Sequence, residues 1–214
     1  MATRVLVVYY SRYGHVEALA RAVGDGAESV RNVEVRMRRV YDDAEATDDA
    51  VTVDDLRWAD AIAWGTPARY GSMVAALKRF LEQCFDVWRQ GDLEDKPTAV
   101  FTSSASIHGG QESTILTMLV SLLHFGMVFV GTPYVQNPQL LVADAIGGSP
   151  YGPSTLAGND NKRPVPEVDL QTARNVGVRL ARIAASLKIV RVTTTRDEVQ
   201  SAAYGSAEGR DAEA

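Results

Sequence analysis

An uninterrupted apolar run at residues 4–10 constrains this chain more than any other feature of its sequence. A strand can be apolar without interruption when both of its faces are buried, as in a parallel sheet covered by helices on both sides. A short polar segment, Ser11 to Gly14, follows the run, and apolar residues then recur at helical spacing from His15 to about Gly24. The chain therefore opens with a strand, a tight loop and a helix.

The same alternation continues along the chain. Further strands are expected at residues 33–40, 61–64, 98–102 and 127–130, and further helices at 72–84, 111–124 and 168–187. Strands that alternate with helices indicate a parallel sheet with right-handed crossovers. We therefore predict an α/β fold, a doubly wound five-stranded parallel sheet of the flavodoxin-like type, in one domain over residues 1–192. The alternation of apolar and charged residues at 33–40 indicates a strand near a sheet edge.

Three segments do not follow this alternation. Residues 133–166 are rich in Gly, Pro and Asn without periodicity, and loops of this length are usually functional or form interfaces. Residues 193–214 form a small, polar tail that we expect to be disordered. The acidic stretch that runs from Asp42 to Asp55 is expected to be a solvated connection.

The composition limits the classes of function. The chain has 22 Lys and Arg against 27 Asp and Glu, a net charge of −5, so nothing favours nonspecific binding to nucleic acid or to a membrane surface. The single cysteine, Cys84, excludes a disulfide framework and a cysteine-cluster metal site, and we expect it to be a small buried residue. No apolar run reaches the roughly 20 residues of a membrane span, and no signal peptide precedes the first strand. We therefore expect a cytoplasmic protein without a metal.

Three polar loops follow the first, third and fourth expected strands, at the sheet edge where ligands bind in such folds. They span residues 11–16, 65–71 and 103–112. The first leads into a helix N-terminus, where free backbone N–H groups and the helix dipole favour a phosphate. Ser11 offers a hydroxyl, Gly14 permits a tight turn, and Arg12 and His15 offer charge. By itself this loop is as readily an ordinary helix cap, and it lacks the Gly-x-Gly-x-x-Gly pattern of a dinucleotide site.

Five motifs in register give the chain a resemblance to the WrbA family of flavodoxin-like NAD(P)H:quinone oxidoreductases. They are YYSRYGH at 9–15, GTPARYG at 65–71, SS at 103–104 with GGQE at 109–112, HFGM at 124–127 and GGSPYG at 147–152. The resemblance covers roughly residues 4 to 187. It implies FMN as cofactor, NADH or NADPH and a quinone as substrates, and a homotetramer or homodimer. The reaction it implies is a two-electron reduction of the quinone by a ping-pong mechanism.

The resemblance also implies which residues hold the ligands. The cofactor residues it implies are Ser11, Arg12, Tyr13, Gly14, His15, Val16, Ala68, Arg69, Tyr70, Ser104, Ala105, Ser106, Ile107, His108, Gly109 and His124. His124 would also be the catalytic residue, Tyr13 would contact the nicotinamide nucleotide, and Trp88 would line the quinone side. From position alone, a residue placed like His124 is more often a charge partner for the end of its helix, and one placed like Trp88 is more often a packing residue. Residues 106–108 are bulkier than the glycine-rich run usual in the family.

Two other functions stay open on the sequence alone. A one-electron flavodoxin-type carrier would hold the same cofactor but would need a partner protein, and the long segment at 133–166 argues for a more built-up site. A non-catalytic flavin-binding interaction protein would hold FMN and show negligible turnover.

Overall fold

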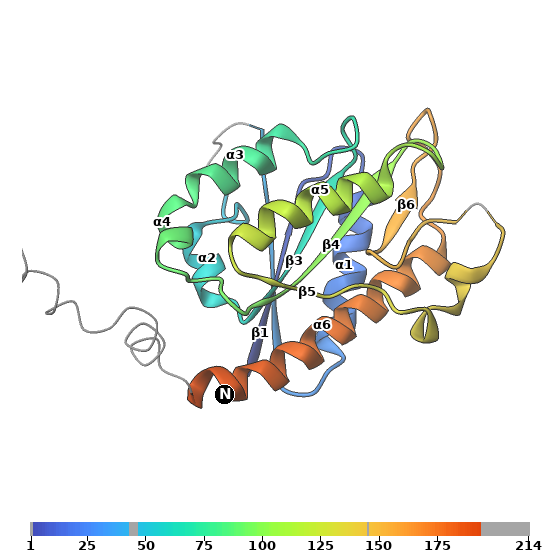
Figure 1. Cartoon of the computed structure of the whole chain (residues 1–214). Coiled ribbons are helices and arrows are strands. Elements are labelled where there is room, and N and C mark those ends of the chain that lie inside the picture. Colours follow the sequence, from blue (N-terminus) through green and yellow to red (C-terminus); the bar gives the residue numbers. More distant parts are fainter. Residues whose placement is uncertain (1, 43–46, 145, 194–214) are drawn as a thin grey trace, which may run out of the picture.

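The computed structural model describes residues 2–42, 47–144 and 146–193 of this chain, and a parallel sheet lies at its centre (Figure 1). The main strands are β1 (Thr3–Tyr9), β2 (Val33–Arg39), β3 (Ala61–Pro67), β4 (Pro97–Ser104) and β5 (Val128–Phe129). Their order is β2-β1-β3-β4-β5, and every neighbouring pair is parallel. The predicted doubly wound, flavodoxin-like sheet is confirmed, with β2 at an edge as expected.

Helices cover both faces of the sheet (Figure 1). One face carries α1 (His15–Glu28) and α6 (Glu167–Thr193), and the other carries α2 (Val53–Trp58), α3 (Ala75–Gln83), α4 (Phe85–Arg89) and α5 (Gln111–His124). Successive side chains of β1 alternate between the two layers, because a strand points its side chains to opposite faces. Val5 and Val7 pack with α1 and α6, whereas Leu6 and Val8 belong to the layer of the other helices. All four are fully buried, which explains the uninterrupted apolar run.

The position of the fifth strand is divided between two short strands. β5 pairs with Pro97 and Thr98 at the start of β4, and a sixth strand, β6 (Ser154–Leu156), pairs with the other end of β4. Between them the chain leaves the sheet and passes through two 3-10 helices, η1 (Tyr134–Gln136) and η2 (Pro138–Leu141). The segment without periodicity is therefore an excursion from the sheet. The chain returns to the sheet as β6, a strand that was not predicted from the sequence.

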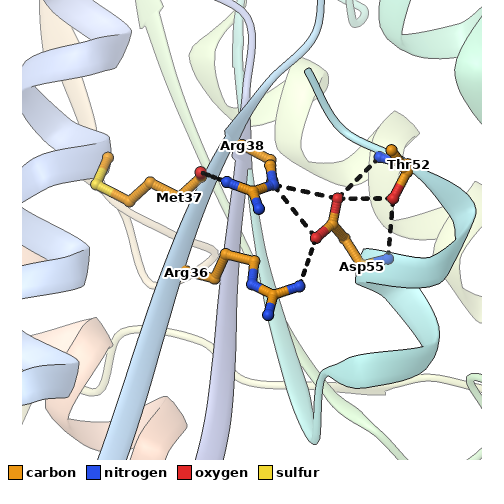
Figure 2. Close-up of polar contacts among 5 residues, drawn as sticks. All are labelled: Arg36, Met37, Arg38, Thr52 and Asp55. Carbon is orange, nitrogen blue, oxygen red and sulfur yellow. Dashed lines mark hydrogen bonds and ion pairs between the residues drawn. The ribbon is translucent and has the colours of Figure 1, made fainter. Parts of the chain in front are cut away.

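The acidic stretch is not wholly a solvated connection, and that prediction is wrong for Asp55. Asp55 is buried in α2, where its Oδ2 accepts the backbone N–H of Thr52 at 3.0 Å in a capping box. Arg36 and Arg38 of β2 donate to the same carboxylate at 2.8 and 3.2 Å (Figure 2). Burial alone would raise the pKa of Asp55, but these hydrogen bonds and charges outweigh burial and hold the pKa below its usual value. The carboxylate thus ties the edge strand to α2.

The helices α1 and α6 cross with their backbones in contact. An ideal Cβ on Gly26 of α1 would lie 2.1 Å from the Arg174 carbonyl oxygen, and one on Gly177 of α6 would lie 2.0 Å from the Val23 carbonyl oxygen. Only glycine fits at such separations. Because α1 begins beside the first polar loop, this crossing fixes the helix on which that loop depends.

The end of α6 lies beyond the expected helix at 168–187, at Thr193. The predicted disordered tail at 193–214 lies, from residue 194 onward, outside the described residues. None of the helices in the described ranges is both long and apolar enough to cross a membrane.

Candidate functional site

The three polar loops meet around one cavity at the carboxyl ends of β1, β3 and β4. The cavity has a volume of about 170 Å³. It is lined by Ser11, Arg12, Tyr13, His15, Val16, Pro67, Ala68, Arg69, Ser103, Ser104, Ala105, Gly109, Ala157 and Asn161. The structure therefore brings together ten of the cofactor residues implied by the resemblance, from loops far apart in the sequence.

The first loop presents backbone N–H groups to this cavity. Ser11 is buried, and its Oγ accepts the backbone N–H groups of Gly14 at 3.2 Å and Glu17 at 3.3 Å. The first N–H groups of a helix have no partner within the helix, so those of His15 and Val16 stay available at the N-terminus of α1. An anionic group such as a phosphate fits a position of this kind.

Gly14 shapes the turn that precedes α1. Its φ of 89° is in the left-handed region, which favours glycine. An ideal Cβ at this position would have no heavy atom within 4 Å, so the space beside Gly14 is open. The structure therefore explains the glycine by its backbone conformation and not by crowding within the protein.

His15 connects the first loop to the chain beyond β6. Its ring is buried, and Nε2 lies 2.8 Å from the carbonyl oxygen of Arg163. Because a carbonyl oxygen can only accept a hydrogen bond, Nε2 carries the proton. Ala157 and Asn161, on the same return segment, complete the wall of the cavity.

The second loop joins the first cavity to a larger hollow. The backbone N–H of Ala68 donates to the Ser103 carbonyl at 2.8 Å, which holds the second and third loops together. Arg12 and Arg69 line the cavity and also a neighbouring hollow of about 590 Å³. Tyr70 lines this second hollow and is fully exposed, with a left-handed φ of 53°. An exposed aromatic ring beside two arginines can contact a flat ligand that extends out of the cavity.

The third loop has a tight base and an exposed tip. The Ser104 hydroxyl donates to the Ser106 carbonyl at 2.7 Å, and an ideal Cβ on Gly109 would lie 2.9 Å from both the Ser104 Cβ and the Ser106 oxygen. Gly109 is therefore required for the loop to close. Ser106, Ile107 and His108 are exposed and border a separate hollow beside the cavity.

His124 and Trp88 lie outside the cavity of their own chain. His124 is exposed at the end of α5, whose 14 residues carry it about 20 Å from the loop that precedes the helix. Trp88 of α4 is 48% exposed, and its ring centroid lies 5.6 Å from that of Phe85, which is also exposed. Their assigned roles stay predictions.

Four cavity residues are not among the cofactor residues implied by the resemblance: Pro67, Ser103, Ala157 and Asn161. Pro67 and Ser103 lie within the second and third polar loops, at 65–71 and 103–112, so their loops were predicted and only their individual roles were not. Asn161 stands in a turn closed by its N–H donating to the Gly158 carbonyl at 3.1 Å, with a left-handed φ of 57°. The run Gly-Asn-Asp-Asn at 158–161 is the only local signal for that turn among the residues around it.

The comparisons with known proteins agree with this geometry. Residues 4–140 match the family described as NADPH-dependent FMN reductase. A Geotalea uraniireducens protein named NAD(P)H dehydrogenase (quinone) is 44% identical over 200 residues, which cover 86% of this chain and 98% of that protein. A Sinorhizobium fredii protein of the same name is 44% identical over 198 residues, with the same shares covered.

A solved structure is similar over a comparable share of the chain. The flavodoxin, WrbA-like protein from Agrobacterium tumefaciens superposes with a TM-score of 0.67 at 26% sequence identity. The match covers 86% of this chain and 99% of that protein.

Proposed function

Because the chain belongs to the NADPH-dependent FMN reductase family and its relatives are named NAD(P)H dehydrogenase (quinone), we propose that it oxidises NADH or NADPH and reduces a quinone, with FMN as its cofactor. The resemblance to the WrbA family is thereby confirmed. The observation that carries the proposal is that the three predicted polar loops meet around one cavity, and that the N-terminus of α1, which suits an anion, lies on one side of it. The cytoplasmic location stays a prediction.

The residues of the cavity fit FMN in three parts. The N–H groups at the start of α1 suit the phosphate. Arg69 and Tyr70 of the second loop would border the ring, and the base of the third loop, formed by Ser104 and Gly109, would border its pyrimidine side. When bound, FMN supplies hydride chemistry, and the chain supplies binding, orientation and charge.

The two substrates are proposed to use one place in turn. The hollow beside Arg12, Arg69 and Tyr70 is open to solvent and adjoins the cofactor cavity. A nicotinamide ring and a quinone are both flat, and either can lie against the face that the cavity leaves open. The oxidised nucleotide then leaves before the quinone enters, which is the order of a ping-pong reaction.

Steady-state kinetics and flavin extraction test this proposal. NADH oxidation measured at several fixed concentrations of a small quinone should give parallel double-reciprocal lines. Flavin released by heating should run as FMN on chromatography. Bound FMN with oxidation of neither NADH nor NADPH would support the one-electron carrier or the non-catalytic binder. Released FAD would contradict the cofactor, and intersecting lines would contradict the mechanism.

Assembly into a homotetramer or homodimer is also proposed. Leu116, Val120 and Leu123 are exposed on α5 at intervals of four and three residues, which places them on one face of the helix. An exposed apolar face of this kind is typical of a protein interface. A second copy on this face would also cover the end of α5, where His124 stands, and would supply the cofactor that His124 and Trp88 do not meet in their own chain.

Light scattering with and without FMN tests the assembly. Val120→Asp should reduce the particle mass and make activity fall steeply on dilution, because a charge would be buried in the interface. Arg21→Glu, an exposed change on α1, is the control and should alter neither. A fully active monomer in the parent chain would contradict the proposal.

A further inference from the structure

Three arginines of the edge strand β2, all near its carboxyl end, have different partners. Arg36 and Arg38 both contact the buried carboxylate of Asp55 (Figure 2). Arg39, the last residue of the strand, instead donates from Nη2 to the carbonyl oxygen of Ser11 at 2.7 Å. This bond joins the sheet edge to the first loop, although the two residues are 28 positions apart.

The register of the sheet explains why Arg39 reaches this loop. Arg39 is paired with Tyr9, the last residue of β1, and Ser11 follows Tyr9 by two residues. The guanidinium also lies 5.2 Å from the ring centroid of Tyr41, a cation–π contact that helps to hold it. Within residues 2–42, 47–144 and 146–193, Arg39 forms no ion pair. No carboxylate in those ranges therefore neutralises its charge by direct contact, in contrast to Arg36 and Arg38.

The bond to Ser11 orients a peptide group that borders the cavity. In a planar trans peptide the C=O and the N–H point in opposite directions. A donor fixed on the Ser11 carbonyl therefore fixes the direction of the Arg12 N–H, on the other side of the same peptide plane. Hydrogen bonding at the carbonyl also polarises the peptide and makes its N–H a stronger donor.

We propose that Arg39 is a positioning residue for the phosphate of the cofactor: it holds the Ser11–Arg12 peptide with the Arg12 N–H turned to the cavity. The proposal rests on the proposed FMN binding. Arg39 does not line the cavity, so it acts through Ser11 and adds a positive charge behind the loop. The other polar group of Ser11, its hydroxyl, is held by Gly14 and Glu17, so the residue is fixed at both ends.

A comparison of FMN with riboflavin, which lacks the phosphate, separates this role from a general structural one. The full-length chain freed of flavin is titrated with each compound, and binding is followed by quenching of flavin fluorescence. Arg39→Gln should raise the Kd for FMN by about tenfold, equivalent to about 1.4 kcal/mol, and change the Kd for riboflavin by less than about twofold. Arg39→Lys, which keeps the charge and a donor, should recover part of the loss.

Arg36→Gln is the matched control, because it removes the same charge from the same strand but from a side chain directed at Asp55. It should leave the ratio of the two Kd values unchanged. Equal losses for FMN and riboflavin in the Arg39 variants, no loss at all, or the same change of ratio in Arg36→Gln would each overturn the proposal. If neither Arg39 variant folds, as judged by circular dichroism, Arg39 serves the fold and the proposal is also overturned. Failure of the parent chain to bind FMN would instead refute the proposed function.

Discussion

Replacement of Gly24 or Gly26 by alanine should shift the stability of this chain in opposite directions, although both residues are buried in α1. At Gly24 an ideal Cβ would lie 3.7 Å from Met37 Sδ and 3.7 Å from Val35 Cγ1, which are ordinary contacts. Alanine is favoured over glycine inside a helix by about 0.8–1.0 kcal/mol, and a well-packed methyl group adds to this. Gly24→Ala should therefore raise the free energy of unfolding by about 1 kcal/mol.

At Gly26 the same gain in helix propensity is opposed by a clash with the backbone of α6. The ideal Cβ would lie 2.1 Å from the Arg174 carbonyl oxygen, and ordinary contact begins at 3.4 Å, so α6 would have to withdraw by 3.4 − 2.1 = 1.3 Å. Overpacking of a core typically costs about 1–3 kcal/mol, and a backbone cannot turn aside as a side chain can. Gly26→Ala should therefore lower the free energy of unfolding by about 1–2 kcal/mol in spite of the propensity gain.

Urea denaturation of the flavin-free chains, followed by circular dichroism, measures both changes without the stabilisation that bound ligand adds. The two variants should differ by roughly 2–3 kcal/mol, which corresponds to several degrees in Tm for a chain of this size. Gly177→Ala, on the opposite side of the crossing, should behave as Gly26→Ala does. Equal stability of the Gly24 and Gly26 variants would show that α1 and α6 do not cross in backbone contact.

Four further predictions concern single residues. Gly14→Val should weaken FMN binding by about tenfold or more in a fluorescence titration, because a β-branched residue is strained at a left-handed φ. Asp55→Asn should cost on the order of 2 kcal/mol at pH 7. Since the pKa of Asp55 is lowered, its stabilisation is fully present above the unfolded pKa of about 3.9 and is lost as pH falls through the folded pKa, so the difference between the parent and Asp55→Asn urea curves should shrink as the pH falls below about 3.9. Burial raises the pKa of Asp169, so the stability that the protonated side chain contributes is lost as pH rises through the folded pKa. The Tm of Asp169→Asn, which does not titrate, should therefore rise relative to the Tm of the parent chain between pH 4 and 8. Burial raises the pKa of the Cys84 thiol to about 11, so a thiol reagent at pH 8 should react only once urea unfolds the chain.

The sequence predicted the elements that bury a continuous face. The apolar run of β1 and the helical spacing of α5 are visible because each residue pattern matches the period of its element. α2 and β6 carry no such pattern. α2 depends on the Thr52–Asp55 capping box and on arginines from a distant strand, and the three residues of β6 form a strand because β4 offers them an edge.

The site could be predicted as far as strand ends determine it. The three loops were identified because parallel strands place their carboxyl ends at one edge. Ala157 and Asn161 reach the cavity only after the long excursion, so nothing near them in the sequence indicates their place. The bond from His15 to the Arg163 carbonyl is equally nonlocal. Neither His124 nor Trp88 lines this cavity, and the roles proposed for them depend on the proposed second subunit.

Because the fifth strand position is divided between β5 and β6, a change in the length of the excursion between them costs little free energy. The chain leaves the sheet at Phe129 and returns at Ser154, and the pairing of β6 with β4 sets the place of return. The entropy of closing a flexible loop grows only with the logarithm of its length, by about 0.6 kcal/mol for each doubling. Evolution can therefore lengthen or shorten this excursion while the cavity wall at Ala157 keeps its register. For the same reason, a domain inserted beside the exposed Val142 is expected to leave the cofactor cavity intact.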